Sequence, residues 1–141
     1  MTELADSLIA AAAGVRGHAY APYSKYLVGA ALISQTGATY TGCNVENASY
    51  GLTICAERGA ISNAVAAEGP GFRIAAIAVV TGEGATPCGA CRQVVAEFAN
   101  GDVPVFLADQ AGKVRTTTVE ALLPGAFTFA ADEPPTKPSV S

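Results

Sequence analysis

Residues 74–107 read IAAIAVVTGEGATPCGACRQVVAEFANGDVPVFL, and this stretch decides the fold. Ile74–Val80 is a short, continuous apolar run with β-branched residues, as expected of a fully buried strand. A loop rich in glycine and threonine separates it from Cys88–Ala99, which is predicted to be a helix. Val103–Leu107 predicts another strand, in which Pro104 indicates an edge position. The order strand, helix, strand is the crossover unit of α/β proteins.

The residues before this unit predict one helix and one β-hairpin. Thr2, a residue type favoured at helix N-caps, precedes a helical pattern whose apolar residues fall on one face. Leu27–Ile33 and Ala38–Cys43 are predicted to be two strands joined by a turn at residues 34–37. The predicted apolar face of the helix consists of Leu4, Leu8, Ala11, Ala12 and Val15.

Two further helical segments complete the pattern. A helix is predicted from about Thr53 to about Ala67, and the sequence Gly69-Pro70-Gly71 ends it. Val119–Leu123 predicts one short helical turn. A hairpin followed by two strand–helix–strand crossovers implies an α/β fold with a mixed sheet and helices packed on both faces.

The composition indicates one folded domain followed by a short tail. Half of the 141 residues are hydrophobic and 14% are charged, which suits a buried core and argues against disorder. The low charge also favours an oligomer that covers some apolar surface. We expect a single domain over residues 1–130. Residues 131–141, which contain Pro134, Pro135 and Pro138, are predicted to be a disordered tail.

The charge balance argues against nucleic acid as a partner. The net charge is −4 and the eight lysines and arginines do not cluster, whereas a phosphate backbone requires a basic face. The N-terminus carries Glu3 and Asp6 rather than the basic segment of a secretory signal. Apolar stretches such as Ile74–Val80 are too short to span a membrane. We therefore expect a cytoplasmic protein with no membrane partner.

Two cysteine-containing segments carry the chemistry, TICAER at residues 53–58 and PCGACRQ at residues 87–93. Each opens a predicted helix. Cys88 and Cys91 are three residues apart, so both sulfurs point the same way on a helix, and Cys55 can supply a third. Helix N-termini favour anions and lower thiol pKa values. Three thiolates at tetrahedral spacing suit zinc and leave one position open for water.

Glu57 lies two residues after Cys55, close to the predicted metal without being a ligand. A carboxylate there can take a proton from an activated water and deliver it to a substrate base and a leaving amine. Three cysteine ligands with such a glutamate are a known variant of the zinc deaminase signature. A lone C-x-x-C more often marks structural zinc or redox chemistry, so a non-catalytic zinc-binding or scaffold protein is the alternative.

A zinc ion with three thiolates carries a net charge of −1, which opposes deprotonation of a bound water. Arg58 and Arg92, each just after a predicted ligand, are candidates to hydrogen-bond the sulfurs and offset this charge. Arg58 is the preferred candidate, and Gln93 is a further predicted donor near the site. The dipoles of the two helices add to the compensation.

The other cysteine and the single histidine are assigned structural roles. Cys43 has no partner at a useful spacing and is predicted to be a buried cysteine at a strand end. His18 is predicted to be a surface or packing residue at the end of the first helix.

Together these motifs resemble those of the small, homotetrameric, zinc-dependent cytidine deaminases. The resemblance runs from AYAPYS at residues 19–24 to LLPGAF at residues 122–127, and it includes GCNVENA at residues 42–48 and both cysteine segments. It implies a three-layer α/β/α sandwich with a mixed sheet of about five strands. It also implies one zinc ion per subunit and hydrolytic deamination of cytidine and deoxycytidine to uridine and deoxyuridine, with release of ammonia, in pyrimidine salvage.

The resemblance also implies how a nucleoside is held. Asn44 and Glu46 correspond to the pair that hydrogen-bonds the sugar 3′-hydroxyl, a group that both donates and accepts. Ala56 would offer its backbone amide to the pyrimidine carbonyl. Tyr26 stands where the family usually has phenylalanine, so an aromatic face for the base is kept but the hydroxyl needs a partner.

Further residues resemble those at sites shared between subunits. Phe127 corresponds to the residue that reaches into a neighbouring subunit and stacks on the pyrimidine. Ala48 and Tyr50 also resemble residues at these shared sites, so that a monomer would have an incomplete pocket. In the implied reaction, water replaces the amino group at C4 of cytosine while Glu57 transfers protons to N3 and then to the amine.

Blasticidin-S deaminases are the nearest rival enzymes, because they have similar zinc motifs and a similar size. They lack the pair seen here as Asn44 and Glu46. The acidic charge balance disfavours a deaminase that acts on polynucleotides.

Overall fold

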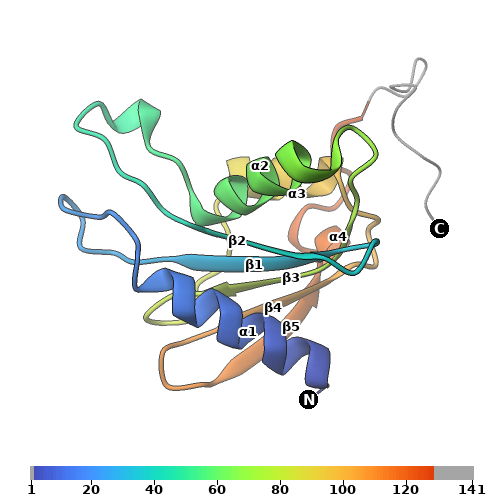
Figure 1. The fold of residues 1–141 in the computed structure, drawn as a ribbon, viewed down its shortest axis with the longest axis horizontal. Helices are drawn as coiled ribbons and strands as arrows, with labels where there is room; N and C mark the ends of the chain where they lie inside the picture. The colour runs from blue at the N-terminus through green and yellow to red at the C-terminus, as the bar shows by residue number, and fades with distance from the viewer. Residues whose placement is uncertain (1, 129–141) are drawn as a thin grey trace.

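The computed structural model describes residues 2–128 (Figure 1), so the tail predicted to be disordered, residues 131–141, lies outside the described residues. None of the helices formed by residues 2–128 is both long and apolar enough to cross a membrane. Five strands form one sheet in the order β2-β1-β3-β4-β5. In chain order the elements are α1 (Glu3–Arg16), β1 (Gly29–Ser34), β2 (Thr39–Cys43), the 3-10 helix η1 (Tyr50–Leu52), α2 (Ala56–Glu68), β3 (Ile74–Val80), α3 (Gly89–Glu97), β4 (Pro104–Ala108), β5 (Val114–Thr118) and α4 (Val119–Leu122).

The sheet is mixed, as the sequence predicts. β1 is antiparallel to both of its neighbours, β2 and β3. β3 and β4 are parallel and are connected through α3, and β5 pairs antiparallel with β4 at the edge. α1 covers one face of the sheet, whereas α2, α3 and α4 lie on the other (Figure 1). This arrangement is the predicted three-layer α/β/α sandwich.

The alternation of side chains along β3 supplies both apolar layers. Ile77 and Val79 belong to the cluster beneath α2 and α3. Ala76 and Ala78 face the other way and join the cluster that buries Leu8 of α1. A strand buried on both faces has no polar side, which explains the continuous apolar run in the sequence.

The prediction that Pro104 lies on an edge strand is wrong, because β5 covers that side of β4. Pro104 is the first residue of β4, opposite Thr118 of β5, and pairing with β3 begins only at Val105. Because Pro104 is not paired with β3, the N–H group that proline lacks removes no hydrogen bond between these two strands. β5 itself, with the sequence VRTTT, lacks the apolar alternation that would have indicated a strand.

Both helices that follow the cysteine segments begin later than predicted. α2 starts at Ala56 rather than near Thr53, because Ile54 is still extended and pairs with Val45. α3 starts at Gly89. Cys55 and Cys88 therefore occupy the N-cap positions, so both thiols lie at helix N-termini.

The buried face of α1 also differs from the predicted one. Thr2 caps the helix as expected, since its side chain accepts a hydrogen bond from the backbone of Ala5. Ala5 and Leu8 are buried with Ala12, whereas Leu4 is exposed. The helix is thus rotated so that Ala5, rather than Leu4, packs beside Leu8 on the alanine-rich face of the sheet.

The two residues assigned structural roles behave differently. Cys43 ends β2 but is only half-buried, so the prediction that it is buried is partly wrong. His18 is exposed just after α1.

Gly42 of β2 allows α2 to lie directly against the sheet. A Cβ atom at this position would overlap the backbone carbonyl of Ala56 and the backbone nitrogen of Ala60. The absence of a side chain thereby sets the distance between β2 and the first turn of α2. This contact fixes the start of the helix that carries Glu57.

Gly42→Ala is expected to lower the thermal unfolding temperature, because the added methyl group forces α2 away from β2 at a cost of about 1–3 kcal/mol. Gly14→Ala is the matched control, since nothing lies within 4 Å of a Cβ atom added at this position of α1. Replacing that glycine is expected to stabilise the helix by about 0.5–1 kcal/mol. Melting curves followed by circular dichroism test both expectations. Equal stability of Gly42→Ala and the unsubstituted protein would show that α2 does not press on β2.

Candidate metal centre and substrate pocket

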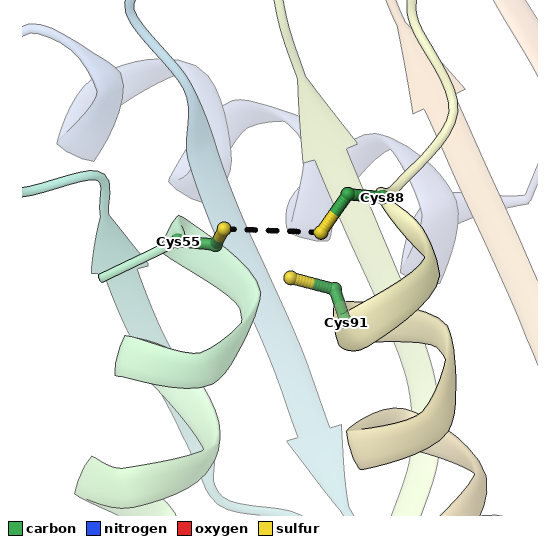
Figure 2. A group of neighbouring side chains, drawn as sticks. All are labelled: Cys55, Cys88 and Cys91. Atoms are coloured by element: carbon green, nitrogen blue, oxygen red, sulfur yellow. Dashed lines mark hydrogen bonds between the residues drawn. The ribbon is translucent and has the colours of Figure 1, made fainter. Parts of the chain in front are cut away.

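Three cysteine sulfurs from two helix N-termini meet in one cluster. Cys55 caps α2, while Cys88 caps α3 and Cys91 lies in its first turn. All three Sγ atoms lie within 4.8 Å of one another, and those of Cys55 and Cys88 are 3.9 Å apart. Figure 2 shows the three side chains pointing toward a common centre. The structure therefore brings together the three residues predicted to bind a metal.

The geometry of the cluster suits zinc. A tetrahedral ion with Zn–S bonds of about 2.3 Å requires sulfurs about 3.8 Å apart, close to the separation of Cys55 and Cys88. Among residues 2–128, no other group of three histidine, cysteine or acidic side chains could hold a metal ion. Thiolate ligands favour zinc over the hard cations that bind oxygen. With three protein ligands, one position of the tetrahedron is left for another group.

Arg58 is the cation beside the sulfurs. Its Nη2 atom lies 3.3 Å from the Sγ atom of Cys55 and donates to the carbonyl of Thr53 at the same distance. A hydrogen bond with Cys91, and then the bond and charge of Arg58, lower the pKa of Cys55. The same bond with Cys55 raises the pKa of Cys91, whose thiol acts as the donor. Arg58 and the thiol of Cys91 thus both favour the thiolate form of Cys55.

Arg92 and Gln93 form hydrogen bonds with groups other than the cysteine sulfurs. Arg92 donates to the carbonyls of Pro87 and Leu122, both at 2.8 Å, and to the hydroxyl of Thr86 at 2.9 Å. Gln93 donates to the carbonyl of Phe127 at 3.3 Å. Within the described part of the chain neither side chain donates to a cysteine sulfur, so the expectation that they assist the thiolates gains no support from these contacts.

Glu57 is a buried carboxyl group beside the cluster. It lies in the first turn of α2 and is only 4% exposed. Burial raises its pKa, and the negative charge of Cys55 acts in the same direction. A carboxyl group with a raised pKa holds a proton more readily than a surface glutamate does, which suits a group that must both accept and deliver protons.

One pocket joins the sulfur cluster to several predicted substrate-binding residues. Its empty volume is about 620 Å³, including space open to solvent. Tyr26, Asn44, Ala56 and Glu57 line it together with the three cysteines. Sequence reasoning missed the remaining wall, whose residues carry no chemical signal of their own: Val28, Thr53, Val79, Thr81, Thr86 and Pro87.

Asn44 holds the segment that carries Tyr26. The asparagine is buried, its Oδ1 atom accepts from the backbone N–H of Val28 at 2.9 Å, and its Nδ2 atom donates to the carbonyl of Tyr26 at 2.8 Å. Burial raises the pKa of Tyr26, whose hydroxyl also interacts with Thr81 and Glu83. Thr81 and Glu83, more than fifty positions away in the sequence, thus supply the partners that the Tyr26 hydroxyl needs.

Glu46 lies in an adjacent pocket rather than beside Asn44. Its Oε1 atom accepts from the backbone N–H groups of Tyr23 and Ser24 at 3.0 and 3.2 Å, and its Oε2 atom accepts from the Ser24 hydroxyl. The Ser24 hydroxyl is the main reason why the pKa of Glu46 is lowered. Thr53 lines this pocket as well as the first, so the two are neighbours.

The residues expected at shared sites are exposed and do not line the pocket that contains the sulfur cluster. Tyr50 is 78% exposed and Phe127 is 69% exposed, and Ala48 is exposed as well. Tyr50 lines the Glu46 pocket, whereas Ala48 and Phe127 line neither pocket. Within one subunit these three residues are therefore not brought to the sulfurs.

Comparison with known proteins identifies the family. Residues 2–107 match the family described as the cytidine and deoxycytidylate deaminase zinc-binding region. A cytidine deaminase of Sporosarcina psychrophila is 49% identical over 122 residues, which cover 86% of this chain and 90% of the relative. The crystal structure of cytidine deaminase from Burkholderia pseudomallei is 49% identical and has a TM-score of 0.82, over 90% of this chain and all of that one.

A second solved structure, cytidine deaminase from Mycobacterium leprae, is 39% identical with a TM-score of 0.74, over 88% of this chain and 99% of that chain. The sulfur cluster and the buried glutamate lie within the residues that match the family. The chain therefore belongs to the cytidine and deoxycytidylate deaminase zinc-binding family.

Proposed function

We propose that the protein hydrolyses cytidine and deoxycytidine to uridine and deoxyuridine, with release of ammonia, as a step of pyrimidine salvage in the cytoplasm. The observation that carries this function is the buried carboxyl group of Glu57 in one pocket with a three-sulfur cluster. The relatives described above are cytidine deaminases and match almost their full length, which supports the same reaction here.

Cys55, Cys88 and Cys91 would hold one zinc ion per subunit. When bound, zinc lowers the pKa of water so that it can act as a nucleophile near neutral pH. Glu57 accepts the proton that the attacking water gives up and passes it to N3 of the cytosine ring. The carboxylate then takes the remaining proton from the hydroxyl added at C4 and transfers it to the amino group, which leaves as ammonia while the ring keeps the oxygen as a carbonyl. Water is the only co-reactant.

Arg58 offsets the excess negative charge of the centre. Three thiolates and a zinc ion sum to −1, which would otherwise make a further negative charge on the nucleophile costly. The 3.3 Å contact between Arg58 and Cys55 supplies a positive charge without occupying the open position. The N-termini of α2 and α3 add partial positive charge at the same place.

The two adjacent pockets suit the two halves of a nucleoside. The pyrimidine would lie in the inner pocket against the ring of Tyr26, with its carbonyl near the backbone amide of Ala56, and the sugar would lie toward Glu46. Asn44 and Glu46 already bind the backbone of residues 23–28. Each keeps hydrogen-bonding capacity, a second amide N–H on Asn44 and further lone pairs on Glu46, with which to hold a sugar hydroxyl.

We further propose a homotetramer whose active sites are shared between subunits. Large apolar side chains are exposed on the segments around η1 and on the C-terminal segment, and a second copy of the chain would cover them. Phe127, Ala48 and Tyr50 would then meet the neighbouring pocket. These exposed side chains are Tyr20, Tyr23, Val45, Tyr50, Leu52, Ile54 and Phe127.

The reaction is tested by ultraviolet monitoring of the zinc-loaded protein with cytidine, deoxycytidine, free cytosine and blasticidin S in parallel. We expect the cytosine absorbance to be lost with both nucleosides but not with the free base, which lacks the sugar that Asn44 and Glu46 would hold. Turnover of blasticidin S alone would assign the protein to the rival activity. Failure to convert any of the four compounds would refute the proposed reaction.

Glu57→Gln is expected to reduce kcat by about 10²- to 10⁴-fold, because the amide keeps the shape of the side chain but cannot transfer protons. Zinc content, measured by atomic emission, is expected to stay at one ion per subunit, since Glu57 is not a ligand. Near-normal turnover by this variant would show that another group carries the protons.

Arg58→Ala tests the role of the cation beside the sulfurs, separately from proton transfer. This variant leaves Glu57 intact but removes the cation beside Cys55, so zinc affinity is expected to fall by about 10- to 100-fold. Competition with a chelator measures that loss. Unchanged affinity would mean that the helix N-termini alone offset the thiolate charge.

Sedimentation velocity tests the oligomer. We expect a single species of about four times the chain mass of 14.1 kDa. An active species that sediments as a monomer would contradict the proposal that neighbouring subunits complete each site.

A further inference from the structure

The segment that ends in Phe127 is attached to α3 at two points. After α4 the chain turns through Gly125, which has a φ angle of +64°, and reaches the exposed ring of Phe127. The carbonyl of Leu122, at the start of this segment, accepts from Arg92 at 2.8 Å. The carbonyl of Phe127, at its end, accepts from Gln93 at 3.3 Å.

Both donors follow Cys91 directly on the helix that supplies two of the three sulfurs. Arg92 also binds the carbonyl of Pro87 and the hydroxyl of Thr86, immediately before Cys88. The loop that enters α3 and the segment that leaves α4 are thus joined through one side chain. Gln93 adds a second attachment five residues further along the segment.

A backbone carbonyl held in place restricts the direction in which the same residue projects its side chain. The bond from Gln93 therefore limits the orientations of the Phe127 ring before any partner binds it, and so reduces the entropy lost on binding. Arg92 fixes the base of the segment. Neither donor lines the wall of either nucleoside pocket described above.

We propose that Gln93 is a positioning residue for Phe127 and that, with Arg92, it links the metal-binding helix of one subunit to the pocket of its neighbour. This inference rests on the proposed function, in which Phe127 stacks on the pyrimidine in an adjacent subunit. Loss of the Gln93 bond then weakens nucleoside binding in the neighbouring site without changing the chemistry of either site.

The position of residue 127 can be measured without any turnover. The chain contains no tryptophan, so Phe127→Trp introduces a single fluorescent reporter at this position. In the zinc-loaded oligomer, Gln93→Met removes the donor at similar side-chain length and is expected to lower the anisotropy of the reporter and to increase its quenching by iodide. Gln93→Lys restores a donor and is expected to return both values toward those of the parent. Identical anisotropy and quenching in all three proteins would overturn the proposal.

Kinetics separate positioning from general damage to the fold. In the chain with Phe127 intact, Gln93→Met is expected to raise KM for cytidine about fivefold, the factor that corresponds to one ordinary hydrogen bond, with kcat and zinc content nearly unchanged. Gln93→Lys is expected to recover most of the KM. In a Phe127→Ala background, Gln93→Met is expected to have no further effect on KM.

An equal rise of KM in the Phe127→Ala background would also overturn the proposal, because Gln93 would then act through something other than Phe127. If Gln93→Met does not fold, Gln93→Glu replaces it, since a carboxylate of the same shape also lacks the donor. If the unsubstituted protein converts no nucleoside, the proposed function fails. The fluorescence of the Phe127→Trp variants still decides whether Gln93 holds residue 127.

Discussion

Two helix N-termini bring three sulfurs to within 4.8 Å of one another, and the topology of the sheet makes this possible. β2 and β3 are both antiparallel to β1, so they run in the same direction and their C-terminal ends lie at the same end of the sheet. Each is followed by a helix that begins with a cysteine at its N-cap. Because helices that follow parallel strands start at the same end of a sheet, the mixed topology places Cys55 opposite Cys88.

The residues around the cluster hold this arrangement rigid and balance its charge. Gly42 lets α2 lie against β2, and Asn44 ties the segment of Tyr26 to the end of the same strand. Arg58 reaches back over one helical turn to Cys55 and Thr53. The site therefore depends on a few short contacts between elements that the hydrophobic core has already positioned. Such a preorganised site needs little rearrangement when charge develops in it.

The sequence predicted the layers and the hairpin from hydrophobic periodicity, and the approach of Cys88 to Cys91 from their spacing. Cys55, which is 33 residues before Cys88, was assigned to the same cluster from the combination of the two motifs and not from local spacing. It missed β5, whose threonines show no apolar alternation, and it misjudged Pro104 because the strand that covers it was not recognised. The partners of Tyr26, Arg92 and Gln93 could not be predicted. The contacts of Tyr26 with Thr81, of Arg92 with Leu122 and of Gln93 with Phe127 join residues 30 or more positions apart, and no local pattern encodes them.

The cysteines at the starts of α2 and α3 also replace the residues that usually stabilise helix N-termini. Neither Cys55 nor Cys88 forms a side-chain cap hydrogen bond, whereas Thr2 and Thr118 cap α1 and α4. Substituting a good cap typically costs about 0.5–2 kcal/mol. The chain thus gives up a capping hydrogen bond at two helices to present sulfur there. A metal ion bound by both thiolates would join the starts of the two helices to each other. Binding of the metal by these two residues would therefore also stabilise the folded chain.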